Sequence, residues 1–232
     1  MKVLGIETAT TVCAAALAID DAVVAEESRE ERYIHAEVLL PMIDTVLRRA
    51  GCTARELAGI AVSIGPGSFT GLRIGLSVAK GLAVATDLPI AAVPTLFGLA
   101  QRVSAARGTR EHILALLDAR RDDVYYQLFR RSHGGLEQLD EEKSAHLDQL
   151  VELIGDRAVT VTGEAGPKLA AYLQRRAPGV KAGGYHFVDG ALAKGSAGTV
   201  ALIGGAHLRE GRSEDPALLE PRYVMEFFTP QR

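Results

Sequence analysis

The sequence predicts an α/β fold that the chain builds twice. Short apolar runs bounded by Gly, Pro or paired Asp alternate with longer stretches of helical periodicity, a pattern typical of strands joined by helical crossovers. The order of strand, acidic residue, turn and strand occurs at the start of the chain and again in its middle. The order of strand, glycine turn and helix also occurs twice. We therefore predict two subdomains with mixed sheets, over residues 1–107 and 108–232, the second including the C-terminal tail.

The elements of the first subdomain follow from apolar runs and from the residues that end them. Apolar strands on both sides of the turn at Asp20-Asp21 predict a three-stranded antiparallel start. Apolar residues at helical spacing, stopped by Gly51, predict a long helix in which Pro41 removes one hydrogen bond. Ser68 or Thr70 can cap the next helix. The expected ranges are strands 3–7, 12–19, 22–27, 60–64 and 89–93, and helices 34–50, 71–85 and 94–106.

The second subdomain repeats this order. An apolar strand ends on Asp118, as the first strand of the chain ends on Glu7. Gly134-Gly135 predicts a hairpin turn, and the corner at 163–167 leads into a helix as the corner at 65–71 does. The expected ranges are strands 112–117, 124–129 and 159–162, helices 147–154, 167–173 and 199–208, loops at 183–184 and 190–198, and an irregular tail.

The helix predicted over 71–85 has two unusual properties. Gly71, Gly75, Ala79 and Ala83 recur every four residues, so one stripe is nearly bare backbone, and most of the remaining surface is apolar. A helix that is apolar all round in a soluble chain is buried on more than one side. One side can face its own sheet. The second half of the chain, the tail or a partner protein can cover the other side, and the pattern leaves these alternatives open.

Composition argues against several classes of function. The chain is 47% apolar and 24% charged with a formal net charge of −3, whereas domains that bind nucleic acid alone are usually basic. Its two cysteines provide neither a disulfide framework nor metal-ligand spacing. Met1-Lys2 leads directly into a strand, and no apolar run reaches the ~20 residues that span a bilayer. We therefore expect a cytoplasmic protein that has no signal peptide and no membrane partner.

Four segments carry a resemblance to a known family. They are residues 6–10 (IETAT), 65–75 (GPGSFTGLRIG), 117–126 (LDARRDDVYY) and 220–224 (EPRYV). Together they resemble the TsaB (YeaZ) family, strongly over residues 1–126 and again in the tail, and the second segment is highly specific. The resemblance implies the duplicated fold of actin, sugar kinases and Hsp70 (the ASKHA fold), in agreement with the internal repeat.

The same resemblance implies a function in tRNA modification, the bacterial synthesis of threonylcarbamoyladenosine (t6A) at position 37. We expect a noncatalytic subunit without a cofactor that binds and activates a catalytic TsaD-like subunit. It would join a TsaE-like ATPase in a ternary complex, form a homodimer when alone and meet tRNA only through the complex. Gly75→Arg is expected to block association while leaving the monomer folded. The expected interface residues are His35, Val38, Leu39, Met42, Leu72, Arg73, Gly75, Leu76, Ala79, Lys80 and Ala83.

The resemblance also indicates where a nucleotide would bind in this fold. Glu7, Thr8 and Asp118 occupy the turns that contact phosphate in nucleotide-binding members, where glycine lets backbone N–H groups approach the ligand. Neither turn contains glycine here, which favours turn and cap roles in a degenerate cleft over a working ATP site. The corner at 65–71 lacks the Lys-Ser/Thr of a P-loop, which favours a tight corner that lets two helices approach.

Two enzyme classes remain as alternatives. A metal-dependent glycoprotease-like peptidase would need paired histidines, but none of the six His residues forms an H-x-x-x-H or H-E-x-x-H pattern. The positions that match the metal-binding pair of the TsaD-like sister protein are Thr95 and Leu99, so we expect no metal. A small-molecule kinase or ATPase of the same fold would require tight ATP binding by the isolated protein.

Overall fold

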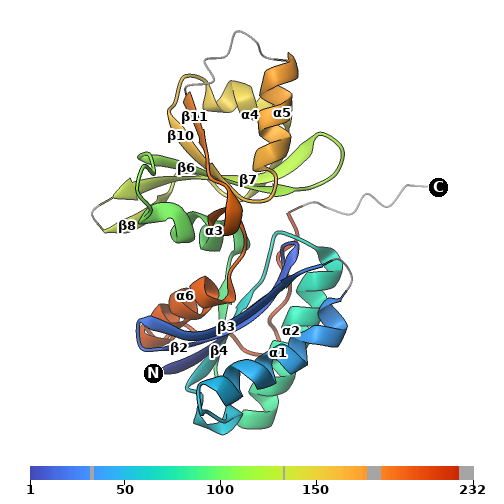
Figure 1. Ribbon diagram of the computed structural model, residues 1–232, viewed down its shortest axis with the longest axis vertical. Coiled ribbons are helices and arrows are strands. Elements are labelled where there is room, and N and C mark those ends of the chain that lie inside the picture. Colours follow the sequence, from blue (N-terminus) through green and yellow to red (C-terminus); the bar gives the residue numbers. More distant parts are fainter. Residues whose placement is uncertain (32–33, 133, 177–183, 225–232) are drawn as a thin grey trace, which may run out of the picture.

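The chain forms two lobes, stacked along the longest axis of the molecule and each built around one sheet (Figure 1). The computed structural model describes residues 1–31, 34–132, 134–176 and 184–224. None of the helices in these ranges is both long enough and apolar enough to cross a membrane.

The first lobe contains a five-stranded sheet in the order β3-β2-β1-β4-β5. The central strand β1 runs antiparallel to β2 and parallel to β4, which in turn runs parallel to β5. Helices α1 and α2 cover one face of this sheet and bury an apolar core against it (Figure 1). The bounds are β1 (Lys2–Glu7), β2 (Val12–Ile19), β3 (Ala22–Glu30), α1 (His35–Arg49), the 3-10 helix η1 (Ala54–Glu56), β4 (Gly59–Ser63), α2 (Phe69–Thr86) and β5 (Ile90–Val93).

The second lobe contains a six-stranded sheet in the order β11-β10-β6-β7-β8, with β9 paired to β7. Its central strand β6 runs antiparallel to β7 and parallel to β10, and β10 runs parallel to β11. Helices α4 and α5 contribute to its apolar core. The bounds are β6 (His112–Asp118), β7 (Asp123–Ser132), β8 (Gly135–Gln138), β9 (Lys143–His146), α4 (Leu147–Ile154), β10 (Val159–Thr162), α5 (Gly166–Arg176) and β11 (Tyr185–Phe187).

The predicted duplication is confirmed, because the two sheets share one topology. In each sheet the first strand pairs antiparallel with the second and parallel with the strand that follows the first helix. A further parallel strand, β5 in the first sheet and β11 in the second, then forms one edge of the sheet. The α/β class and the mixed sheets follow from the same pairings.

The two halves of the chain exchange their last helices. Helix α3 (Thr95–Ser104) belongs to the first half of the sequence but packs through Leu96, Leu99 and Val103 on β6 and β7 of the second sheet. Helix α6 (Ala197–Arg209) packs through Val200 and Ile203 on the first sheet, on the face opposite α1 and α2 (Figure 1). The division of the chain at residue 107 stays a prediction, and each lobe contains one helix from the other side of that position.

Three local predictions were wrong or incomplete. Strands β9 and β11 were not predicted, although the repeat calls for a strand at β11, in the place that β5 holds in the first lobe. The predicted loop at 190–198 contains a 3-10 helix, η3 (Gly190–Ala193), and its last two residues belong to α6. The early start of α6 has a local cap, because Ser196 Oγ accepts a hydrogen bond from the backbone N–H of Thr199, and Glu26 on β3 also accepts one from the backbone N–H of Gly198. The predicted loop residue Gly183 lies outside the described residues.

Candidate functional site

The glycine-rich corner after β4 starts helix α2 by a local cap. Ser68 is the N-cap residue, and its Oγ accepts a hydrogen bond from the backbone N–H of Gly71 at 3.2 Å. Such a cap satisfies one of the N–H groups that the first turn of a helix leaves unpaired. Of the two predicted cap residues, Ser68 is therefore confirmed.

Two glycines of this corner, Gly67 and Gly71, and Gly75 in α2 face the β1–β2 turn (residues 8–11) of the same chain. A Cβ atom at Gly71 would lie 2.0 Å from the carbonyl oxygen of Thr8, and one at Gly75 would lie 2.1 Å from Thr8 Oγ1. A Cβ atom at Gly67 would lie 2.1 Å from the carbonyl oxygen of Ala9. The missing side chains thus let α2 approach this turn, and the prediction that they let two helices approach each other is wrong.

The same contacts contradict one expected mutational effect. Gly75 is buried against Thr8, so an arginine at this position has no space inside the folded chain. Gly75→Arg would disturb the monomer itself, and loss of association in that variant would say nothing about an interface.

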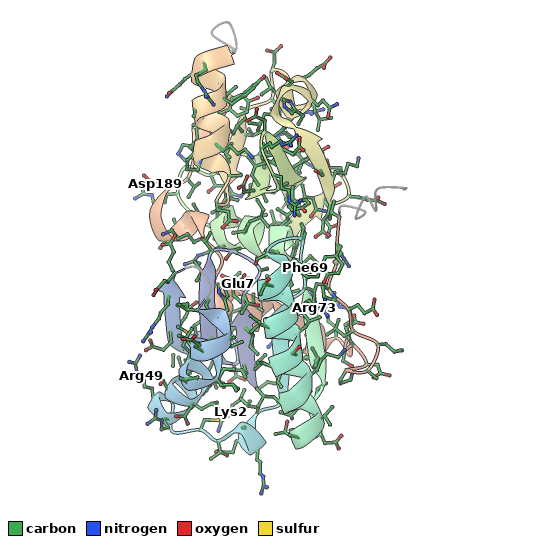
Figure 2. The ribbon with its side chains drawn as sticks, turned by 90° about the vertical axis from the view of Figure 1, so that its right-hand side faces the viewer. Lys2, Glu7, Arg49, Phe69, Arg73 and Asp189 are labelled. Atoms are coloured by element: carbon green, nitrogen blue, oxygen red, sulfur yellow. The ribbon has the colours of Figure 1, made fainter. Side chains whose placement is uncertain are left out.

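Most of the predicted interface residues are buried within the chain. Helices α1 and α2 lie side by side (Figure 2), and their inward positions pack on the first sheet. Three of the predicted residues are not buried. Val38 is half-buried, Arg73 is exposed, and the half-buried Lys80 donates a hydrogen bond from Nζ to the carbonyl oxygen of Leu219 at 2.9 Å. The buried residues are His35, Leu39, Met42, Leu72, Gly75, Leu76, Ala79 and Ala83.

His35 begins α1 and is one of these buried residues. Burial lowers the pKa of its imidazole, and a hydrogen bond with the backbone of Thr10 acts in the opposite direction. The side chain therefore supports the β1–β2 turn from the α1 side. His35 is only 8% exposed and so offers little surface to a partner protein.

The outward side of α1 and α2 nevertheless carries apolar residues, beside charged ones such as Asp44 and Arg73. Leu40 on α1 is 53% exposed and Val84 on α2 is 76% exposed. Ile74 and Val78 on α2 are half-buried, and a Cβ atom at Gly81 would meet no atom within 4 Å. Helix α2 contains no acidic residue. We call Leu40, Ile74, Val78, Gly81 and Val84 the α1–α2 surface.

Glu7, the first of the predicted acids, is buried at the end of β1, between the lobes and near the start of α2 (Figure 2). Its Oε1 accepts hydrogen bonds from the backbone N–H groups of Ala9 at 2.8 Å and Thr10 at 3.1 Å. Burial raises the pKa of Glu7 to about 7, although hydrogen bonds with Ser63, Ala9 and Thr10 oppose this shift. Its carboxyl group thus caps the β1–β2 turn from inside the first lobe.

The other backbone N–H groups of the β1–β2 turn also have partners within the protein. The N–H of Thr8 points to Ser63 Oγ at 3.4 Å, and the N–H of Thr11 donates to Oε2 of Glu164 in the second lobe at 3.0 Å. Phosphate groups in nucleotide sites are held by backbone N–H groups of this kind. Here carboxyl and hydroxyl oxygens of the protein accept those hydrogen bonds.

Asp118, the second predicted acid, has a different environment. Its side chain is 59% exposed, and its Oδ1 accepts a hydrogen bond from Lys168 Nζ at 2.6 Å. Lys168 also donates to the backbone carbonyl of Asp123 at 2.8 Å. Glu7 and Asp118 thus lie at equivalent strand ends but differ in their surroundings. Glu7 is a buried carboxyl group, and Asp118 belongs to an exposed ion pair.

The positions that match a metal-binding pair have structural roles. Thr95 Oγ1 accepts a hydrogen bond from the backbone N–H of Gly65 at 3.1 Å, and Leu99 is buried in the core between α3 and the second sheet. Within the described ranges, no three His, Cys, Asp or Glu residues lie close enough to hold a metal ion. A pocket of about 860 Å³ between the lobes has Phe97, Leu136 and Arg222 in its lining, along with further apolar residues and charges of both signs.

The residues that join the lobes are not predicted by the sequence. Glu164 is only a residue of the corner that the repeat aligns with the corner at 65–71, and this alignment does not indicate its contact with the other half. Arg222 in the tail segment binds Glu142 of the second lobe at 3.3 Å, and Arg102 on α3 donates to the backbone carbonyl of Lys194 before α6 at 2.9 Å. No local pattern in the sequence indicates these contacts.

Comparisons with known proteins agree with this geometry. The family model "TsaD: tRNA N6-adenosine threonylcarbamoyltransferase" matches residues 28–188. The tRNA threonylcarbamoyladenosine biosynthesis protein TsaB of Escherichia coli (strain K12) is 36% identical over 164 residues, which are 71% of this chain and 69% of that protein.

Solved structures show the same relationship over almost the whole chain. YeaZ from Pseudomonas aeruginosa has a TM-score of 0.78 at 26% identity and covers 96% of this chain and 99% of its own. The activator of the 2-hydroxyisocaproyl-CoA dehydratase from Clostridium difficile, with a TM-score of 0.53 at 12% identity, covers 91% of this chain and 97% of its own, and shares the fold alone. The fold is thus the duplicated ASKHA type, and the chain belongs to the TsaB (YeaZ) family of proteins for tRNA threonylcarbamoyladenosine biosynthesis.

Proposed function

We propose that this protein is the noncatalytic subunit that binds and activates a TsaD-like catalytic subunit during t6A formation. The observation that carries the proposal is the α1–α2 surface. Leu40 and Val84 are large apolar side chains that face solvent, and Gly81 leaves the backbone of α2 bare near Val84. Exposed apolar residues on two neighbouring helices are typical of a protein–protein interface.

The position of Gly81 favours a helical partner. With no Cβ at this position, a helix of the partner could approach the backbone of α2 closely. The partner that we propose carries the same fold, because a TsaD family model matches 28–188 of this chain. Two copies of this chain would offer each other the same surface, so the homodimer that forms in the absence of TsaD uses the residues that the heterodimer uses.

The proposed subunit contributes binding rather than chemistry. The N–H groups of the β1–β2 turn already bond to Glu7, Ser63 and Glu164, which leaves no open cradle for phosphate there. The TsaE-like ATPase then supplies nucleotide chemistry in the ternary complex. The net charge of −3 supports contact with tRNA through the complex rather than through this chain.

Gly81→Arg tests the proposed surface. A Cβ atom at Gly81 meets no atom within 4 Å, so the variant should fold, and the loss of a helical glycine should keep its melting temperature at or above that of the wild type. The bulky charged side chain should weaken association with the TsaD-like subunit at least about a hundredfold, by blocking close approach over a desolvated apolar surface. Isothermal titration calorimetry measures the affinity, and light scattering should show that the variant alone is a monomer.

Ala171→Arg is the matched control. Ala171 is an exposed small residue on a helix of the second lobe, α5, so the same charge is added far from the α1–α2 surface. This control should bind as the wild type does. If Gly81→Arg also binds with wild-type affinity, the α1–α2 surface is not the interface and the proposal loses its structural basis.

A further inference from the structure

The two lobes are bridged by carboxylates at two separate places. At the first, the backbone N–H of Thr11 in the β1–β2 turn donates to Oε2 of Glu164 in the β10–α5 turn at 3.0 Å. This hydrogen bond joins residues that lie 153 positions apart in the chain. Hydrogen bonds with a charged acceptor are about twice as strong as bonds between neutral groups.

The second bridge involves the segment before the C-terminal tail. The backbone of Arg222 is tied to the first lobe, because its N–H donates to the carbonyl oxygen of Ile64 at 2.7 Å. Its guanidinium group reaches Glu142 of the second lobe at 3.3 Å. The side chain of Glu142 is only 7% exposed and that of Arg222 is 52% exposed, so the ion pair is shielded from water on the Glu142 side.

The bridges act at different strands of the first sheet. Thr11 lies in the turn between β1 and β2, whereas Arg222 is attached to Ile64, just beyond the end of β4. In the sheet order β3-β2-β1-β4-β5, these attachments are on the two sides of the central strand β1. One bridge alone would let the lobes rotate relative to each other about that contact. Two bridges, one on each side of β1, oppose this rotation.

We propose that these two bridges form a built-in clasp that holds the lobes in one closed arrangement without any bound ligand. The carboxylate of Glu164 serves the turn as an external anion would, because it accepts the Thr11 N–H from the opposite lobe. The Arg222–Glu142 pair closes the other side. The proposal concerns the isolated chain and does not depend on the proposed partner.

The surroundings of Glu164 disfavour the ionised form of its carboxyl group. Burial raises the pKa of its carboxyl group, and the nearby negative charges of Asp118 and Glu30 raise it further, while the hydrogen bond with Thr11 lowers it. Lys168 pairs with Asp118 and Lys194 pairs with Glu30, so each of the two competing acids has its own cation. The carboxylate of Glu164 therefore remains available to accept the hydrogen bond from the Thr11 N–H.

Hydrogen exchange of the Thr11 amide tests the first bridge. In Glu164→Ala the amide loses its acceptor, and its exchange should accelerate at least about tenfold, in line with the loss of a hydrogen bond to a charged group. Glu164→Gln retains an acceptor oxygen of the same shape and should keep most of the protection. Glu152→Ala, an exposed glutamate on α4 of the same lobe, is the control and should exchange as the wild type does.

Distances between spin labels test the clasp as a whole. Asp44→Cys on α1 and Gln149→Cys on α4 place one label on each lobe at exposed sites, and the native Cys13 and Cys52 are buried. Labelled protein is mixed with an excess of unlabelled protein, so that only distances within one chain contribute. The double variant Glu164→Ala/Arg222→Ala should broaden the distance distribution clearly more than either single variant.

Two results would overturn the proposal. One is unchanged exchange of Thr11 in Glu164→Ala. The other is a distance distribution of the double variant that matches the wild type, which would mean that the exchanged helices α3 and α6 hold the lobes on their own. Because the Glu164→Gln variant is nearly isosteric, a fold defect in Glu164→Ala can be recognised by comparison of their circular dichroism spectra.

Discussion

At the scale of single residues, Glu7 shows how a buried acid can be held by hydrogen bonds from the backbone, with the positive charge of Arg102 close enough to interact with it. Two backbone N–H groups and Ser63 favour its ionised form, but burial outweighs them and raises the pKa to about 7. A carboxyl group with this pKa carries a proton in much of the folded protein near neutral pH. Glu7 therefore makes the stability of the protein depend on pH.

The sign of this dependence is set by the difference between folded and unfolded states. The folded pKa of about 7 lies above the ordinary value of 4.5, so between these two values the folded state binds a proton that the unfolded state has released. Raising the pH across this interval should thus lower the free energy of unfolding by about 3 kcal/mol relative to Glu7→Gln. Urea denaturation of both proteins at several pH values measures the difference. Parallel pH profiles for the two proteins would mean that the pKa of Glu7 is the same in the folded and unfolded states, which would contradict the shift.

At the scale of one element, helix α2 contains glycines of two kinds. Gly75 faces inward and needs its missing side chain, because Thr8 Oγ1 occupies the space where a Cβ would be. Gly81 faces outward and meets nothing within 4 Å. The sequence shows both as helical glycines, and a helix normally loses stability at each such position relative to alanine.

Alanine substitutions should therefore have opposite effects at these two positions. Gly81→Ala should stabilise the protein by about 0.5–1 kcal/mol, because alanine loses less backbone entropy in a helix. Gly75→Ala should destabilise it by about 1–3 kcal/mol, because the new methyl group overpacks against Thr8. Urea denaturation measures both changes.

A second substitution distinguishes overpacking from other causes. Thr8→Ala removes the hydroxyl group that the methyl group of Gly75→Ala would meet. The double variant Thr8→Ala/Gly75→Ala should thus be more stable than the sum of the single effects predicts. Additive effects would mean that Gly75 is constrained by something other than this contact.

At the scale of the whole molecule, the exchange of α3 and α6 makes each lobe depend on both halves of the chain. Leu99 on α3 is buried against the second sheet, and Ile203 on α6 is buried against the first. Arg102 adds a polar link, because its guanidinium group donates to backbone carbonyl groups of the segment that precedes α6. Neither lobe has a complete core without a helix from the other half.

Core truncations in these helices should therefore act on the opposite half of the sequence. Leu99→Ala and Ile203→Ala should each cost about 2–5 kcal/mol, as large-to-small changes in a core do. Hydrogen exchange should accelerate in β6 and β7 for Leu99→Ala and in β1 and β4 for Ile203→Ala. Acceleration confined to the half of the sequence that carries the substitution would contradict the exchange of helices.

The sequence by itself determined the features that depend on neighbours along the chain. Apolar periodicity located most strands and helices, Ser68 was recognised as a cap, and the repeated order of elements predicted two sheets of one topology. The all-round apolar character of α2 also predicted burial on its inner side. Such signals are local, because helix and strand periods and end caps involve residues only a few positions apart.

Only the tertiary structure decided which side of α2 each glycine faces, where the last helix of each half packs, and which residues bridge the lobes. Gly75 and Gly81 are both helical glycines, but Thr8 occupies the space beside Gly75 and no atom lies within 4 Å of a Cβ at Gly81. Glu164 and Thr11 lie 153 positions apart in the chain, and the docking of the two lobes brings them together. Contacts of this range depend on the geometry of the complete fold, and no period or cap in the sequence encodes them.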